Sequence, residues 1–221
     1  MIENQNTFIS QNLNGCLSRL PASIISLKPA INIYPLNALQ RYIALLNNPC
    51  LPPYGRELMQ TDKTESLLHI ARSIVAKVPY CMAITVTEAG HANARIVEPY
   101  SLSEQWSVRF LTGRQCRKVQ EMQHTGRMTL SYQCDEDHAY VTLLGQAKVL
   151  DHDPALKSTL WRKNSDLWFP GGPFDPDVVV IELLVEQVEL WCLKLGVAPP
   201  PVGLQAAILK RDGADWITLV G

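Results

Sequence analysis

The sequence predicts a mainly β domain with inserted helices, in which about six antiparallel strands close into a small barrel. Six segments between residues 80 and 191 are rich in β-branched residues, and several alternate apolar with polar positions as half-buried strands do. Most links between these segments are short, which favours antiparallel neighbours. Curling such a sheet into a closed or partly closed barrel removes its exposed edges. A six-stranded antiparallel barrel is therefore the expected architecture.

The first half of this domain is expected to open with a helix. Asp62 is a typical N-cap, and Glu65 stands three residues further on, as in a capping box. Apolar residues then recur at helical spacing until Pro79 ends the run. The strands expected in this half are residues 80–87, 92–99 and 106–112.

The second half is expected to alternate strands with helices. Gly145 is placed to bend the fifth strand. Asp153 followed by Pro154 is a typical helix start, with Asp153 as the cap. The helices expected here are residues 114–124 and 153–164, and the strands are residues 127–134, 139–150 and 178–191.

Composition divides the chain into three parts. They are an N-terminal extension, residues 1–60, the barrel domain, residues 61–195, and a Pro-rich spacer with a C-terminal arm, residues 196–221. Glu3 is the only acid before Gly55, a weak organelle-targeting signature, and a poorly ordered or loosely docked extension is the other interpretation. We expect a cytoplasmic protein, or a plastid or mitochondrial one if the extension is a transit peptide. A short helix is expected at 35–46, and a hairpin or docked arm at 206–219.

Charge and cysteine usage exclude several classes of function. A net charge of −1 argues against general binding to nucleic acid or membrane surfaces. No apolar run approaches the ~20 residues needed to span a bilayer. The six cysteines contain no C-x-x-C pair and are expected to be reduced thiols. The Asp-Glu-Asp-His run at 135–138 is interpreted as a solvated hairpin tip, so no metal site is expected.

Cations and a hydroxyl cluster at the ends of neighbouring predicted strands. Arg95 lies in one strand, Thr112 ends the next, and Arg117-Lys118 opens a short helix. The net charge between Arg109 and Arg127 is +4 in a chain of net −1. Phosphate is held by guanidinium and ammonium groups, hydroxyls and the free N–H groups of a helix start. The pattern indicates a phosphate-bearing ligand, and a solvated cationic helix face is the alternative.

An ordered series of short motifs runs from about Leu67 to Trp191. Its pieces are Gly90 to Arg95-Ile96-Val97, Arg109-Phe110-Leu111-Thr112, Arg117-Lys118-Val119, Tyr140 to Ala147, Leu160-Trp161, Trp168-Phe169-Pro170, Asp175-Pro176 and Glu189-Leu190-Trp191. In order and spacing, over more than half of the chain, the series resembles the FMN-binding split barrel of the pyridoxamine 5'-phosphate oxidase superfamily. It is most similar to the general-stress-protein subgroup of pyridoxamine phosphate oxidase-like proteins.

The resemblance implies a homodimer of split barrels with one FMN in each of two clefts between the subunits. The contacts that it implies are Arg95 with the flavin or its phosphate, Ile96 and Val97 with the ring edge, Leu111 and Thr112 with the cofactor, Arg117 and Lys118 with the phosphate, and Trp161 and Trp168 with the cleft wall. Core packing is the alternative role for each tryptophan, because aromatic side chains usually fill cores.

Three positions depart from the family pattern. Ala94 and Cys116 stand where hydroxyl residues are usual, which removes hydrogen bonds to phosphate. Glu98 adds a negative charge close to the expected position of the flavin ring. The cations of the pattern are retained.

The resemblance implies a flavin-dependent oxidoreductase that acts with a small-molecule substrate or electron donor. In such a site the cofactor carries the redox chemistry and the protein supplies orientation and electrostatics. No residue is assigned as a catalytic acid or base. The alternative is a non-catalytic protein that binds flavin, a related cofactor or a tetrapyrrole in a stress response.

Overall fold

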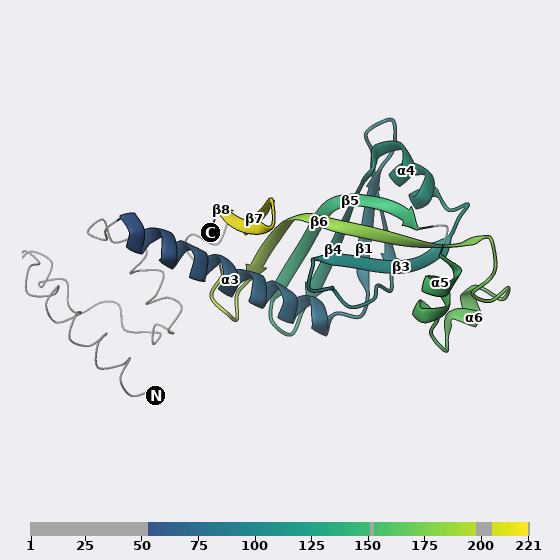
Figure 1. The fold of residues 1–221 in the computed structure, drawn as a ribbon, viewed down its shortest axis with the longest axis horizontal. Helices are drawn as coiled ribbons and strands as arrows, with labels where there is room; N and C mark the ends of the chain where they lie inside the picture. Colours follow the sequence, from purple (N-terminus) through teal and green to yellow (C-terminus); the bar gives the residue numbers. More distant parts are fainter. Residues whose placement is uncertain (1–52, 151–152, 198–204, 221) are drawn as a thin grey trace, which may run out of the picture. The chain divides into compact units, whose positions relative to one another are not determined.

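The protein contains one antiparallel sheet of eight strands with four helices around it in the part of the chain that the structure describes (Figure 1). The structure is a computed structural model that describes residues 53–150, 153–197 and 205–220. The order of the strands is β2-β1-β4-β5-β6-β7-β8, and β3 pairs with β6 outside this path. The strands are β1 (Cys81–Val86), β2 (Ala92–Val97), β3 (Ser107–Gly113), β4 (Arg127–Cys134), β5 (Ala139–Leu150), β6 (Val178–Cys192), β7 (Ala207–Asp212) and β8 (Asp215–Val220).

Strand β6 organises the sheet because it pairs with three other strands. One edge of β6 pairs with β5 along most of its length. On the other edge, the first half of β6 pairs with β3 and the second half pairs with β7. Residues of β4 and β5 alternate between buried and more exposed positions, as the sequence predicts for strands with one face on a core.

Gly145 marks an irregularity in the pairing of β5 with β6, where the register shifts between Leu144 and Gly145. A Cβ atom at residue 145 would lie 1.9 Å from the carbonyl oxygen of Leu184, so only glycine allows the two backbones to approach this closely. The position at which the sequence predicts a bend, Gly145, therefore coincides with the point where the pairing of β5 with β6 is irregular and their backbones approach closely.

Helix α3 (Pro53–Lys77) contacts strands β4 to β8, and its buried apolar side chains among the described residues are Leu67, Ala71, Ile74 and Val75. These are among the apolar residues at helical spacing in the sequence. The expected N-cap at Asp62 is wrong, because the helix already begins at Pro53. The helix ends two residues before Pro79, in keeping with the steric restriction that proline imposes on the preceding residue.

The other helices differ from the expected ones at their ends. Helix α4 (Arg117–Thr125) begins three residues later than predicted and ends at Gly126, whose φ of 66° closes the helix in the left-handed conformation. The single helix expected at 153–164 is wrong. The structure has α5 (Pro154–Leu160) and α6 (Ser165–Trp168), and the extended backbone of Trp161 separates them.

The tail is a hairpin, and it explains why the sheet has eight strands rather than the predicted six. β7 pairs with β6, and β8 pairs with β7 through a turn at Gly213, where φ is 61°. The Trp216 ring packs on Trp106 with 5.1 Å between the ring centroids, and the guanidinium of Arg72 lies over the Trp106 ring. The helix expected at 35–46 and the prolines at 199–201 lie outside the described residues.

Among the described residues, no helix is long and apolar enough to cross a membrane. Cys81, Cys134 and Cys192 are free and buried, as the sequence predicts for structural thiols. Burial raises the pKa of Cys81 to about 12, so this thiol stays protonated at neutral pH.

Asp137 corrects the interpretation of residues 135–138 as a solvated hairpin tip. Its side chain is 2% exposed. It accepts one hydrogen bond from Lys77, at the end of α3, and another from Lys194, just after β6, whose Nζ lies 2.8 Å away. The contacts from Lys194 and Lys77 lower the pKa of Asp137 to about 2. One carboxylate therefore fastens the end of α3 and the end of β6 to the turn between β4 and β5.

Replacing Asp137 with asparagine is expected to destabilise the protein at pH 7 and to flatten its acid denaturation. The folded pKa lies below the unfolded value of about 3.9, so this carboxylate stabilises the fold above that value and loses its contribution as the pH falls towards 2. Urea unfolding at pH 7, 4 and 3 measures the effect. Asp135→Asn is the control, because Asp135 is exposed and its carboxylate accepts a hydrogen bond only from Gln133 among the contacts described. Equal acid sensitivity in the wild type and the Asp137 variant would contradict this assignment.

Candidate functional site

A cavity of about 690 Å³ lies where β2 and β3 end and α4 begins. Its remaining wall comes from the segment at 162–169, which joins α5 to α6 and includes α6. We call residues 154–170 the helical arm. Figure 1 shows α4 and the helical arm near the same end of the sheet. Residues from four separate parts of the chain therefore meet around one space of the size that ligand sites usually have.

Six of the nine residues predicted as cofactor contacts line this cavity. They are Ile96, Val97, Leu111, Thr112, Lys118 and Trp168. The other three, Arg95, Arg117 and Trp161, are not among the lining residues. The structure thus brings six of these residues together around one cavity and leaves the other three outside its lining.

The polar end of the cavity is formed by the start of α4 and the end of β3. Lys118 donates a hydrogen bond to Cys116 Sγ at 3.4 Å, and Thr112 Oγ1 lies 3.2 Å from the same sulfur. Cys116 is the N-cap residue of α4 but makes no side-chain capping bond. An ammonium, a hydroxyl and the N-terminus of a helix all favour an anion. Arg117 is exposed at the first residue of α4.

The cavity lining also contains large apolar and aromatic side chains. Trp168 and Ile96 are 80% and 70% exposed, which is unusual for large apolar side chains that line a cavity. Trp161 does not line the cavity itself but packs on Phe169, which does, with 6.0 Å between the ring centroids. The Trp161 indole N–H donates to Asp166 at 2.9 Å. The structure thus shows a packing contact for Trp161.

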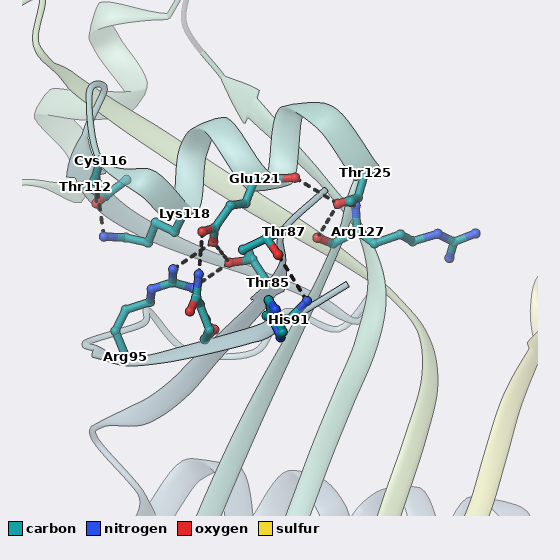
Figure 2. A network of polar contacts seen from close by, with 11 residues as sticks. Thr85, Thr87, His91, Arg95, Thr112, Cys116, Lys118, Glu121, Thr125 and Arg127 are labelled. Carbon is teal, nitrogen blue, oxygen red and sulfur yellow. Dashed lines mark hydrogen bonds and ion pairs between the residues drawn. The ribbon is translucent and has the colours of Figure 1, made fainter. Parts of the chain in front are cut away.

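Arg95 lies in a network of polar contacts that joins the β1–β2 hairpin to α4 (Figure 2). Its guanidinium donates to Thr85 Oγ1 at 2.5 Å, to the Asn93 carbonyl at 2.9 Å and to Glu121 at 2.9 Å. Thr85 and Asn93 also donate to Glu121. The hydrogen bond from Thr85, followed by those from Arg95 and Asn93, lowers the pKa of Glu121 to about 2.

Glu98 is expected from the sequence to place a negative charge close to the flavin ring. In the structure, the charge of Glu98 is paired. Its carboxylate forms an ion pair with Arg162 of the helical arm, at 2.5 Å. Arg162 also donates to the Pro99 carbonyl and lies over the Tyr100 ring, 4.1 Å from its centroid. Tyr100 in turn donates its hydroxyl to the Leu160 carbonyl. These contacts fasten the helical arm to the chain after β2 and neutralise the acid.

Sequence reasoning missed several residues that line the cavity, including Tyr80, Tyr100, Arg162, Lys163 and Phe169. The basic pair Arg162-Lys163 directly follows Trp161, which the motif series includes, and was the available signal. The tyrosines stand outside every motif in that series, so nothing in the sequence pointed to them.

The net charge of +4 between Arg109 and Arg127 does not form one cluster. Arg109 pairs with Glu182 of β6, and Arg127 pairs with Glu186. Figure 2 shows Arg127 pointing away from Lys118. The local charge at the cavity is therefore set mainly by the residues at the start of α4 and on the helical arm.

Comparison with known proteins gives a family match over much of the chain. Residues 67–211 match the family model described as "Pyridoxamine 5'-phosphate oxidase like". No curated protein matches the sequence significantly.

Several solved structures share the fold. A protein from Clostridium acetobutylicum related to general stress protein 26 of B. subtilis has a TM-score of 0.55 and 22% identity, over 68% of this chain and 99% of that one. A pyridoxamine 5'-phosphate oxidase-related, FMN-binding protein from Nostoc punctiforme has a TM-score of 0.53 and 17% identity, over 76% and 96%. PhzG from Burkholderia lata, in complex with tetrahydrophenazine-1-carboxylic acid, has a TM-score of 0.51 and 21% identity, over 77% and 96%. This likeness confirms the predicted split-barrel fold class.

Proposed function

Because the chain belongs to the pyridoxamine 5'-phosphate oxidase-like family, we propose that its cavity binds FMN and that the protein is a flavin-dependent oxidoreductase acting on a small molecule. One observation carries the proposal. A single cavity is lined both by an anion-binding end, made by Lys118, Thr112 and the start of α4, and by the aromatic side chains of Trp168 and Phe169. A phosphate linked to a planar ring requires this combination. The FMN-binding protein from Nostoc punctiforme has the same fold.

The residues present fit the cofactor. Lys118, with Arg117 beside it in the chain, would supply positive charge to the phosphate, and Thr112 would supply a hydroxyl. Val97 and Leu111 offer apolar contact to the ring, and the Glu98 charge that would oppose flavin binding is neutralised by Arg162. When bound, FMN supplies the transfer of hydride or electrons, and the protein contributes binding, orientation and exclusion of water.

A second copy of the chain is proposed to complete the site. Ile96, Trp168, Leu167 and Phe174 are all more than two-thirds exposed, and the first two line the cavity rim. Large exposed apolar side chains grouped in this way mark an interaction surface. A homodimer with its cofactor clefts between the subunits would cover them. Size-exclusion chromatography with light scattering tests this, and a monomer at micromolar concentration would contradict it.

The spectrum of the purified protein tests the proposed function. We expect FMN to bind with perturbed visible absorbance and quenched fluorescence, and NADH or NADPH added without oxygen to bleach the bound flavin. Riboflavin should bind more weakly because it lacks the phosphate that the start of α4 attracts. A protein that takes up neither flavin would contradict the proposal. The free buried thiols support a reducing compartment, and we propose the cytoplasm.

One observation favours the second candidate, a protein that holds the flavin without turnover. Among the described residues that line the cavity there is no histidine, and the only carboxylate, Glu98, is paired with Arg162. The described lining therefore offers neither a histidine nor an unpaired carboxylate as a general acid or base. FMN that binds tightly but resists reduction by every donor would support this carrier function over the oxidoreductase.

A further inference from the structure

We propose that Glu121 sets the selectivity of the site for a phosphorylated flavin by neutralising Arg95, and that Arg95 is a positioning residue that does not contact the phosphate. This inference rests on the proposed binding of FMN. It reverses the role that the sequence resemblance implies for Arg95. The observation that carries it is the network in Figure 2, where Arg95 points at Glu121 and the hydroxyl of Thr85.

Three of the five N–H donors of Arg95 are engaged in this network. Nη1 donates to Thr85 Oγ1 and to the Asn93 carbonyl, and Nη2 donates to Glu121. The ion pair is also sheltered, because the Arg95 and Glu121 side chains are only 21% and 11% exposed. Removing one partner from a sheltered pair leaves an uncompensated charge, which is costly. A phosphate that drew Arg95 off the hairpin would therefore have to break these three hydrogen bonds.

Glu121 is itself held from three sides. Asn93 donates to one carboxylate oxygen at 2.6 Å, and Thr85 and Arg95 donate to the other. Thr85 is buried, so its hydrogen bond to Glu121 is shielded from solvent. The carboxylate is thus fixed in its charged form and orientation, and it keeps Arg95 on the hairpin.

Glu121 is close enough to the anion-binding end to influence it. Lys118 and Glu121 are three residues apart on α4, so they lie on one face of the helix, about one turn from each other. A phosphate beside Lys118 would feel both charges of the Arg95–Glu121 pair, and these nearly cancel. Removing only the negative charge of Glu121 would leave the Arg95 guanidinium without its counter-ion. It would then act as an additional cation on the phosphate, because charges near a protein surface interact beyond direct contact.

The test compares FMN with riboflavin in the wild type, Glu121→Gln and the double variant Arg95→Gln/Glu121→Gln. Flavin fluorescence quenching at low ionic strength gives both affinities. We expect Glu121→Gln to raise the preference for FMN over riboflavin about fivefold. The double variant removes both charges together, and we expect its preference to stay within about twofold of the wild type. Riboflavin affinity in each variant reports whether the rest of the cavity is intact.

A direct phosphate contact by Arg95 would give the opposite result. The double variant would then lose FMN affinity about tenfold or more while keeping riboflavin affinity. That outcome, or an unchanged preference in Glu121→Gln, would overturn the inference. If the wild type bound neither flavin, the proposed function would fail separately. Inorganic phosphate, followed by ³¹P NMR, would still test the inference, since its affinity should rise in Glu121→Gln and stay unchanged in the double variant.

Discussion

Replacing Arg117 and Lys118 together with alanine is expected to weaken FMN binding by about tenfold or more and to leave the fold intact. Lys118 lines the cavity at its anion-binding end, and Arg117 is exposed at the first residue of α4. A hydrogen bond to a charged group contributes about 1.5–3 kcal/mol, so the loss of even one phosphate contact corresponds to this factor. Neither side chain belongs to the buried core, so unfolding is not expected.

Titration with FMN and with riboflavin separates the two consequences of this change. Affinity for riboflavin should change little, because it has no phosphate. Lys210→Ala is the matched control for the loss of a cation, since Lys210 is exposed on β7 and does not line the cavity. FMN affinity equal to that of the wild type in the double alanine variant would place the phosphate elsewhere. A parallel loss of riboflavin affinity would point to damage of the whole cavity.

Gly145→Ala is expected to destabilise the protein strongly. The new Cβ would lie 1.9 Å from Leu184 O and 3.1 Å from Glu186 N, both of which belong to the backbone of β6. Because backbone cannot rotate away as a side chain can, β5 and β6 would have to separate. Overpacking of this kind costs about 1–3 kcal/mol and sometimes more, and we expect a value at the upper end.

Gly113→Ala is the matched control on β3. Its added methyl group would meet only Cys116 Sγ, at 3.9 Å, which is an ordinary van der Waals contact. Its free energy of unfolding should stay within about 0.5 kcal/mol of the wild type. Chemical denaturation of both variants measures the difference. Equal stability of Gly145→Ala and the wild type would show that the two strands can part there without cost.

The strands were predictable because their signals are local. The bounds expected for the fourth and fifth strands agree with β4 and β5 at both ends, since each strand alternates buried and more exposed residues and a polar turn lies between them. For the segment that forms β7 and β8, the sequence allows either a hairpin or a docked arm. Its place next to β6 depends on pairing between Ala207 and Leu190, and no local signal encodes such a pairing.

The candidate site was predictable in part for a similar reason. Leu111, Thr112 and Lys118 follow from their positions at a strand end and a helix start, where backbone geometry directs them to the cavity. The surroundings of Arg95 depend on Glu121, a residue 26 positions away on another element. A count of charges in the sequence treats both as free. Only the fold shows that they neutralise each other.

The contact between α3 and the C-terminal hairpin has a consequence for the order of folding. Thr64 Oγ1 and Thr218 Oγ1 lie 2.8 Å apart although 154 residues separate them in the chain. During synthesis, α3 emerges long before β8, so part of its apolar face stays uncovered until the hairpin arrives. Contacts this distant in sequence form slowly, and exposed apolar surface promotes aggregation in the meantime. The nascent chain therefore exposes apolar surface that the C-terminal hairpin covers once the fold is complete.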